Sequence, residues 1–206
     1  MHTKNIITAG KELDQAQKVL ILIHGRGGTA RDILGLANHF PVEEFAWVAP
    51  EASNNTWYPY SFMAPISQNE PWLSSALDLL CDLLEEIKRK GFSSENIYIG
   101  GFSQGACLAA EFITRNANRF GGAMLFTGGL IGDQINEENY SGDFKGTPIF
   151  MGTGNPDAHV PVERIRDTEK ILKSMGARVS VQVYDGRPHT ISMDEIEKAT
   201  EMIFAS

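Results

Sequence analysis

The residues with the clearest chemical pattern are Gly101-Phe102-Ser103-Gln104-Gly105, which fit the motif G-x-S-x-G. A short apolar run precedes them, and an alanine-rich helical pattern follows. Between a strand and a helix, this motif forms a nucleophile elbow, in which a tight, strained turn exposes the serine hydroxyl. The flanking glycines let the two backbones approach closely. We therefore predict that Ser103 is a nucleophile; the alternative is a serine that only caps the helix.

A serine hydroxyl is a poor nucleophile unless a base lies beside it and an acid orients that base. Where this elbow supplies the nucleophile, the acid follows it in the chain and the histidine comes last, each after a strand. Asp157 follows the apolar run over 148–151, and His189 follows the alternating run over 179–183. Their order and placement predict Asp157 as the acid and His189 as the base.

Other histidines and carboxylates compete for these two roles. His2 lies at a terminus, His39 at a helix end, and His24 and His159 in turns. Asp133 and Asp143 follow an earlier strand, and Asp185 is too close to His189 in the chain. We expect His24 to shape the glycine turn that follows it, and His159 to be exposed. The alternative for His189 itself is a surface loop histidine, and for Asp157 an ordinary turn aspartate.

Acyl transfer places negative charge on the former carbonyl oxygen, where backbone N–H groups must stabilise it. One donor is expected to be the N–H of Gln104, directly after the nucleophile at a helix N-terminus. The other is expected from the Gly25-Arg26-Gly27-Gly28 turn, at the N–H of Arg26. In that role the Arg26 side chain is free, and whether it contacts the substrate is open. The alternative is a turn that only connects a strand to a helix.

The elements that must position these residues alternate between strands and helices. Apolar or alternating runs predict strands at 6–8, 18–24, 45–50, directly before the elbow, and at 123–127, 148–151 and 179–183. Helical spacing predicts helices over about 29–38, 71–90, 106–113, 162–175 and 193–204. The alternation predicts an α/β fold, a mostly parallel three-layer sheet in a single domain over 1–206, with the 179–183 strand on an edge.

Two long connections stand out between these elements. Residues 51–72 are rich in aromatic side chains, and connections of this length in a compact domain are usually functional or mobile. We predict that this stretch helps form a substrate pocket, with Trp57, Tyr58, Phe62 and Met63 as its lining. The polar, glycine-punctuated segment 128–146 has room for a short lid or turn.

Composition narrows the class of protein. A formal charge of −8 over 206 residues argues against a nucleic-acid partner and against a polybasic membrane contact. The N-terminus lacks a signal-peptide pattern, and no apolar run is long enough to span a bilayer. Cys81 and Cys107 fall in apolar helical patterns, which predicts buried free thiols and a cytoplasmic protein. No cluster of metal ligands stands out, so we expect no metal.

Four segments together resemble the phospholipase/carboxylesterase family of small α/β-hydrolases, which includes the acyl-protein thioesterases. They are His24–Gly28, Gly101–Ala106, Asp157-Ala158-His159-Val160-Pro161 and His189-Thr190-Ile191. The resemblance spans nearly the whole chain. It implies an α/β-hydrolase fold, a serine hydrolase for carboxylic esters or thioesters, no cofactor, and often a homodimer. It assigns nucleophile, acid and base to Ser103, Asp157 and His189, and oxyanion donors to Arg26 and Gln104.

The sequence departs from that family in two places, both on the substrate side. Trp57-Tyr58-Pro59 stands where relatives tend to have an aromatic pair followed by aspartate, and Gly186-Arg187-Pro188 is a bulkier approach to the histidine than usual. The preferred substrates of the family therefore transfer less well to this chain than its chemistry does.

Three other functions compete with the serine hydrolase. Gly25–Ala30 fits the dinucleotide fingerprint G-x-G-x-x-G/A, with Glu51 closing the next strand, which would indicate an NAD-type oxidoreductase. A hydrolase fold kept as a non-catalytic binding module is the second. The third uses Cys107 as the nucleophile, although its place one turn into the helix after Ser103 predicts that it points into the core.

Overall fold

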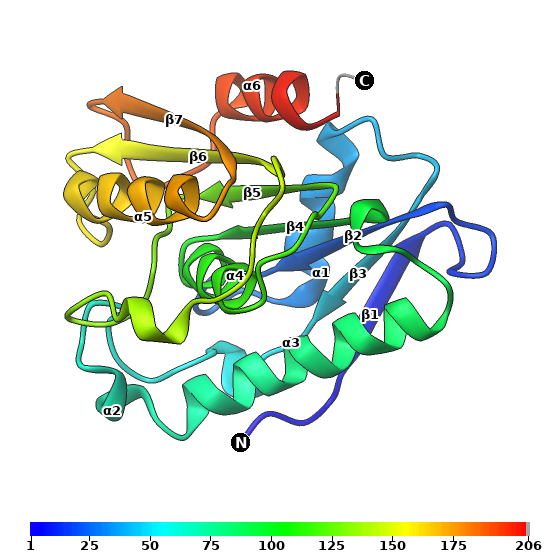
Figure 1. The fold of residues 1–206 in the computed structure, drawn as a ribbon, viewed down its shortest axis with the longest axis horizontal. Helices are drawn as coiled ribbons and strands as arrows, with labels where there is room; N and C mark the ends of the chain where they lie inside the picture. The colour runs from blue at the N-terminus through cyan, green and yellow to red at the C-terminus, as the bar shows by residue number, and fades with distance from the viewer. Residues whose placement is uncertain (205–206) are drawn as a thin grey trace.

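In the computed structural model, which describes residues 1–204, seven strands form one sheet in the order β1-β3-β2-β4-β5-β6-β7 (Figure 1). Residues 205–206 of the predicted domain lie outside the described residues. The strands are β1 (Ile6–Gly10), β2 (Lys18–Ile23), β3 (Phe45–Pro50), β4 (Ile97–Phe102), β5 (Gly122–Phe126), β6 (Pro148–Asn155) and β7 (Arg178–Asp185). Only β1 runs antiparallel to its neighbour among these pairs. The mostly parallel sheet and the edge position of β7 agree with the prediction.

Helices cover both faces of this sheet, which makes three layers. They are α1 (Ala30–Leu34), α2 (Ile66–Asn69), α3 (Trp72–Arg89), α4 (Gln104–Arg115), α5 (Val162–Ser174) and α6 (Met193–Ile203). Figure 1 shows α3, α4 and α5 on one side of the sheet and α1 and α6 on the other, and the buried residues divide into two apolar cores in the same way.

Strand β2 shows why the apolar run that predicts a strand at 18–24 has apolar residues at successive positions. Val19, Ile21 and Ile23 point into the core beneath α3, α4 and α5, whereas Leu20 and Leu22 point into the core beneath α1 and α6. Because successive side chains of a strand face opposite sides, a strand covered on both faces needs apolar residues at every position.

The helix predicted over 29–38 is present in two parts. Thr29 caps α1 in a capping box with Asp32, whose carboxylate accepts a hydrogen bond from the Thr29 N–H. From Gly35 the chain continues as a 3₁₀ helix, η1 (Gly35–His39). Glycine has a low preference for the α-helix interior, which accounts for the change at this residue.

The two long connections contain more order than their composition suggests. Residues 51–72 include a 3₁₀ turn, η2 (Ser53–Asn55), and the short helix α2. The 128–146 segment starts inside the core, where Leu130 and Ile131 are fully buried. The Arg164 guanidinium donates to the carbonyl oxygens of Leu130 at 2.8 Å and Gly132 at 2.7 Å, so the start of this segment is tied to α5.

The cysteines are free, and Cys107 is buried as predicted, whereas Cys81 is only partly buried. Within residues 1–204, no helix combines the length and the apolar character needed to cross a membrane.

Candidate active site

Ser103 forms the sharp turn between β4 and α4, with φ 55° and ψ −121°. These angles are unfavourable for a residue with a side chain and cost of order 1–3 kcal/mol. Two backbone hydrogen bonds hold the turn: the Ser103 N–H donates to the Phe126 carbonyl at 2.9 Å, and the Ser103 carbonyl accepts from the Cys107 N–H at 3.0 Å. The hydroxyl is therefore held at the C-terminal end of the sheet, as an elbow requires.

The flanking glycines are needed for close backbone packing. A side chain on Gly101 would overlap the carbonyl group of Gly105, and one on Gly105 would overlap the carbonyl oxygens of Ile23 and His24. The elbow thus packs directly on the end of β2.

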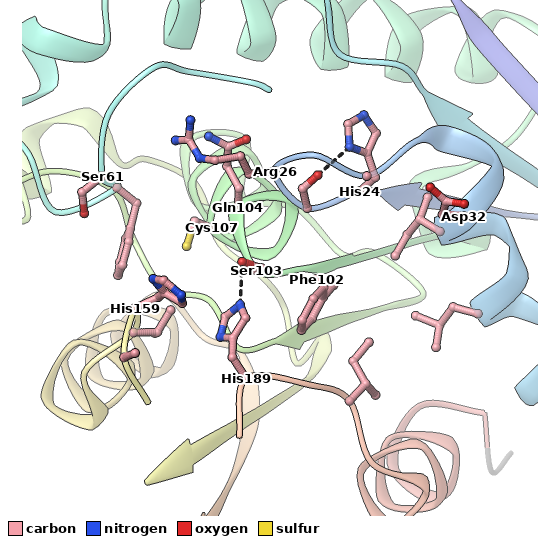
Figure 2. A pocket seen from close by; sticks show the side chains of 18 of the residues that line it. His24, Arg26, Asp32, Ser61, Phe102, Ser103, Gln104, Cys107, His159 and His189 are labelled. Carbon is pink, nitrogen blue, oxygen red and sulfur yellow. Dashed lines mark hydrogen bonds between the residues drawn. The ribbon is translucent and has the colours of Figure 1, made fainter. Parts of the chain in front are cut away.

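Ser103, Asp157 and His189 come together from three separate loops. His189 Nε2 lies 2.8 Å from Ser103 Oγ, as the dashed line in Figure 2 marks, and His189 Nδ1 lies 2.8 Å from Asp157 Oδ2. Asp157 leaves the end of β6, and His189 lies in the loop after β7, so parallel neighbouring strands deliver both side chains to one edge of the sheet.

The turn around Asp157 holds its carboxylate in place. Oδ1 accepts hydrogen bonds from the backbone N–H groups of His159 at 2.8 Å and Val160 at 2.9 Å. Burial by itself raises the pKa of Asp157, but these two N–H groups and the His189 ring outweigh burial and lower the pKa below its ordinary value of 3.8. The carboxylate is therefore ionised throughout the neutral range.

The competing acids lie elsewhere. Asp133 and Asp143 are exposed, and Asp143 accepts a hydrogen bond from the Lys145 N–H. Asp185 accepts from the Asn155 side chain at 3.0 Å.

Among the competing histidines, His159 is exposed as expected, and its ring packs edge-on against His189 with centroids 5.0 Å apart. His2 bonds to the 53–57 stretch, and His39 lies exposed at the end of η1.

His24 shapes the glycine turn, as expected. Its Nε2 accepts from the Ala52 N–H at 3.0 Å, so in the neutral ring Nδ1 carries the proton and donates to the Gly25 carbonyl at 2.8 Å (Figure 2). The Gly28 N–H donates to the same carbonyl at 3.1 Å. Because C=O and N–H point in opposite directions in a trans peptide, holding the Gly25 carbonyl also directs the Arg26 N–H.

The two expected oxyanion donors are not used by the fold. Within residues 1–204, neither the backbone N–H of Arg26 nor that of Gln104 has a hydrogen-bond acceptor. The prediction that the Arg26 side chain is free is wrong, however. Its guanidinium donates four hydrogen bonds to residues 56–60, which the Gln104 side chain also contacts. The sequence carries no local sign of this contact, because the two stretches are about thirty residues apart.

A cavity of about 1090 Å³ opens around Ser103 and His189. Figure 2 shows Asp32 and Ser61 on opposite sides of Ser103, so the cavity extends in two directions from the nucleophile. Toward α1 and α6 its wall is mainly apolar, with Ile33, Leu36, Phe102, Ile191, Met193 and Ile196. No residue of the 128–146 segment is among the lining residues of the described chain, and so the segment does not cover this cavity.

The aromatic stretch contributes only part of the predicted lining. Tyr58 and Phe62 line the cavity, but Trp57 and Met63 do not. Trp57 is fully buried, its Nε1 donates to the His24 carbonyl at 2.8 Å, and its ring packs on the His24 ring. The structure thus corrects the placement of Trp57: it supports the glycine turn from behind.

The geometry also disfavours two competing functions. The Glu51 carboxylate accepts from the Ala30 N–H at 2.6 Å, so a protein side chain occupies the helix N-terminus where a dinucleotide pyrophosphate would have to bind. Burial raises the pKa of the Cys107 thiol to about 12. Since the thiolate is the nucleophilic form, Cys107 is a poor candidate for the nucleophile.

One supporting contact was not foreseen. Arg187, two residues before His189, forms an ion pair with Glu195 in the first turn of α6, and the Glu195 side chain is fully buried. Glu195 also accepts from the Ser192 N–H at 2.9 Å in a capping box. The spacing S-x-x-E is a recognisable signal for the start of α6, but nothing local indicates its pairing with Arg187.

The fold and the site geometry are those of an α/β-hydrolase, and comparison with known proteins agrees. A family model described as Phospholipase/Carboxylesterase matches residues 3–206. Acyl-protein thioesterase 1 of Kluyveromyces lactis is 24% identical over 222 residues, which cover 97% of this chain and 96% of that protein. A probable carboxylesterase of Arabidopsis thaliana, described as SOBER1-like, is 24% identical over 201 residues, which cover 88% of this chain and 76% of that protein.

A solved structure is more similar still. The crystal structure of a phospholipase/carboxylesterase from Dyadobacter fermentans superimposes with a TM-score of 0.97 at 53% identity, covering 98% of this chain and 97% of that one. The chain belongs to the phospholipase/carboxylesterase family. The predicted family, the α/β-hydrolase fold and the class of carboxylesterase-type hydrolase are confirmed.

Proposed function

We propose that this protein hydrolyses carboxylic esters or thioesters of small or acyl-chain substrates through an acyl-enzyme intermediate on Ser103. The observation that carries the proposal is the position of His189, with one ring nitrogen 2.8 Å from Ser103 Oγ and the other 2.8 Å from Asp157 Oδ2, at the wall of the cavity. With its Nδ1 proton donated to the carboxylate, the neutral ring presents an unprotonated Nε2 to the serine hydroxyl.

Acylation follows from this arrangement. His189 Nε2 takes the Ser103 proton while Oγ forms a bond to the substrate carbonyl carbon. The negative charge that develops on the carbonyl oxygen is stabilised by the free backbone N–H groups of Arg26 and Gln104. His189 then protonates the leaving oxygen or sulfur, the bond to the carbonyl carbon breaks, and the alcohol or thiol departs.

Deacylation repeats the sequence with water as the nucleophile. His189 takes a proton from the water, the oxygen attacks the acyl carbon, and the same ring returns the proton to Ser103 Oγ as the carboxylic acid leaves. Asp157, ionised at neutral pH, stabilises the positively charged ring in both steps.

The names of the relatives support hydrolysis of both thioesters and oxygen esters, since they include an acyl-protein thioesterase and a probable carboxylesterase. Phe62, one of the predicted pocket residues, lines the wall of the cavity. The centroid of its ring lies 6.0 Å from Cζ of the Arg164 guanidinium. We expect Phe62→Ala to shift the preferred acyl length toward longer chains. An unchanged chain-length profile in Phe62→Ala would argue against this part.

The decisive test is hydrolysis of p-nitrophenyl esters from acetate to long acyl chains by the wild type and by Ser103→Ala. Loss of the nucleophile should lower kcat by on the order of 10⁶-fold. Ser93→Ala is the matched control, because Ser93 is exposed and makes no side-chain cap. A fluorophosphonate should label the wild type and the control but not Ser103→Ala.

Two outcomes would count against this function. Equal, robust rates in wild type and Ser103→Ala would mean that Ser103 is not the nucleophile. Absence of both turnover and labelling in the wild type would favour the non-catalytic binding module. One relative, from rice, is described as a probable inactive carboxylesterase, which gives this alternative a precedent.

We further propose, from the length and cysteine content of the chain, a single domain over 1–206 in the cytoplasm, and, from the family resemblance, a homodimer that uses no cofactor. Sedimentation equilibrium distinguishes monomer from dimer, and a single cooperative melting transition is expected for one domain.

A further inference from the structure

The side chain of Arg26 converges on one short stretch, residues 56–60. Nη1 donates to Thr56 Oγ1 at 2.9 Å and to the Pro59 carbonyl at 3.0 Å, while Nη2 donates to the carbonyls of Tyr58 at 2.9 Å and Tyr60 at 2.7 Å. Each terminal nitrogen of a guanidinium carries two N–H groups, so all four are engaged. This leaves only the Nε–H for any other partner, and argues against Arg26 as a binding group for an anionic substrate.

The side chain of Gln104 reaches the same stretch. Its Oε1 accepts from the Trp57 N–H at 3.0 Å, and its Nε2 donates to the Tyr58 carbonyl at 2.8 Å. Thr56 joins the two side chains, because its hydroxyl oxygen accepts from Arg26 and lies 3.3 Å from Gln104 Oε1. The Tyr58 carbonyl accepts from both. In Figure 2 the guanidinium and the carboxamide lie beside each other and point away from Ser103.

The backbone N–H groups of Arg26 and Gln104 also both lack an acceptor among residues 1–204. One comes from the glycine turn after β2 and the other from the start of α4, and within residues 1–204 no hydrogen bond joins the backbones of these two residues directly. To stabilise one oxyanion, both N–H groups must lie about 2.7–3.1 Å from the same oxygen. The packing of the elbow on the end of β2 brings the two backbones together, and a group that contacts both residues can then set the final spacing of the two N–H groups.

We propose that the Arg26 guanidinium is a positioning group for the oxyanion hole: by binding residues 56–60 together with the Gln104 carboxamide, it sets the spacing of the Arg26 and Gln104 backbone N–H groups. This inference rests on the proposed function of the site. The side chain acts through the backbone of its own residue and does not touch the substrate.

The first test is the kinetics of Arg26→Met and Arg26→Lys with a p-nitrophenyl ester. Removing an oxyanion donor costs about 10²–10³ in kcat, so loosening two donors is expected to lower kcat by about 10- to 100-fold, with KM within about threefold. Lysine keeps the charge, but one ammonium group cannot span four acceptors, so Arg26→Lys is expected to resemble Arg26→Met.

A second readout separates positioning from general loss of structure. An alkylboronic acid forms a tetrahedral anionic adduct with a serine nucleophile, whereas the product carboxylic acid does not. The affinity for the boronic acid should fall in parallel with kcat/KM in both variants, while the affinity for the product acid stays within about threefold. A purely structural role would lower Tm without changing the ratio of these two affinities.

The matched control is Arg31→Met, which removes an exposed arginine of α1 that does not line the cavity. If Arg26→Met does not fold, Thr56→Val tests the same link, since it removes the shared hydroxyl but keeps the shape; we expect a smaller loss, about 3- to 10-fold in kcat. Retention of kcat and boronic-acid affinity within twofold in Arg26→Lys and Thr56→Val would overturn the proposal.

The wild type and Ser103→Ala keep the two proposals separable. Ser103-dependent turnover with unaffected Arg26 variants overturns the positioning role alone. Absence of Ser103-dependent turnover and of fluorophosphonate labelling in the wild type overturns the proposed function and, with it, this inference.

Discussion

Asp157 Oδ2 lies 2.8 Å from His189 Nδ1, while Oδ1 of the same carboxylate is held by two backbone N–H groups of its own turn. The acid is thus oriented before it contacts the ring. Asp157→Asn keeps the shape of the side chain but no longer favours the tautomer that accepts the serine proton. We expect kcat to fall by on the order of 10⁴-fold with the fold retained. Asp185→Asn, at an exposed aspartate, is the control; a loss below tenfold in Asp157→Asn would contradict this role.

The lowered pKa of Asp157 predicts a pH dependence of stability. Because the folded state lowers this pKa, the ionised group contributes stability above its ordinary value of 3.8, and that contribution is lost as the pH falls through the lower value in the folded protein. The Tm difference between wild type and Asp157→Asn is therefore expected to be present at about pH 5 and to shrink in more acidic buffer. A difference that persists unchanged to the acid limit of folding would show that ionisation is not its cause.

The ion pair between Arg187 and Glu195 ties the His189 loop to α6. Both side chains are nearly or fully buried, so removal of Arg187 leaves the buried Glu195 carboxylate without a balancing positive charge, held only by its capping contacts with Ser192. Arg187→Met is expected to lower the free energy of unfolding by about 3–5 kcal/mol, measured by urea denaturation. Lys198→Met, which breaks an exposed ion pair with Asp194 on the same helix, should change stability little. Similar small effects in both variants would mean that the buried pair contributes little.

The backbone strain at Ser103 predicts a difference between two inactive variants. Alanine at this position must adopt the same unfavourable φ of 55°, whereas glycine adopts it without a steric penalty. Ser103→Gly is therefore expected to be more stable than Ser103→Ala by about 1 kcal/mol in chemical denaturation. Equal stability, or a more stable alanine variant, would indicate that the turn stores no strain.

The raised pKa of Cys107 predicts a thiol that does not react in the folded protein. With a pKa of about 12, only about one molecule in 10⁴ carries the thiolate at pH 8. Iodoacetamide should leave Cys107 unmodified in native protein and alkylate it in guanidinium, as peptide mass spectrometry can show. Rapid native alkylation of Cys107 would contradict both its burial and its exclusion as a nucleophile.

Much of the fold follows from local patterns in the chain. β3 spans the predicted 45–50, and the remaining strands lie at their predicted places. A strand covered on both faces must be apolar at each position, whereas an edge strand such as β7 alternates, and glycine, proline or a polar cap ends a strand. The positions of Ser103, Asp157 and His189 were predictable for a related reason. Each directly follows a strand, and parallel strands end at one edge of the sheet, so order in the chain translates into proximity.

The sequence by itself therefore determined the architecture and the position of the chemistry, since both depend on periodicity and order along the chain. Only the tertiary structure decided how the site is supported. Trp57 lies behind the glycine turn and not in the cavity, Glu51 covers the start of α1, and Arg26 binds residues 56–60. Each of these contacts joins segments about twenty or more residues apart. The path of the intervening loop decides which polar group a side chain meets, and no local periodicity encodes that path.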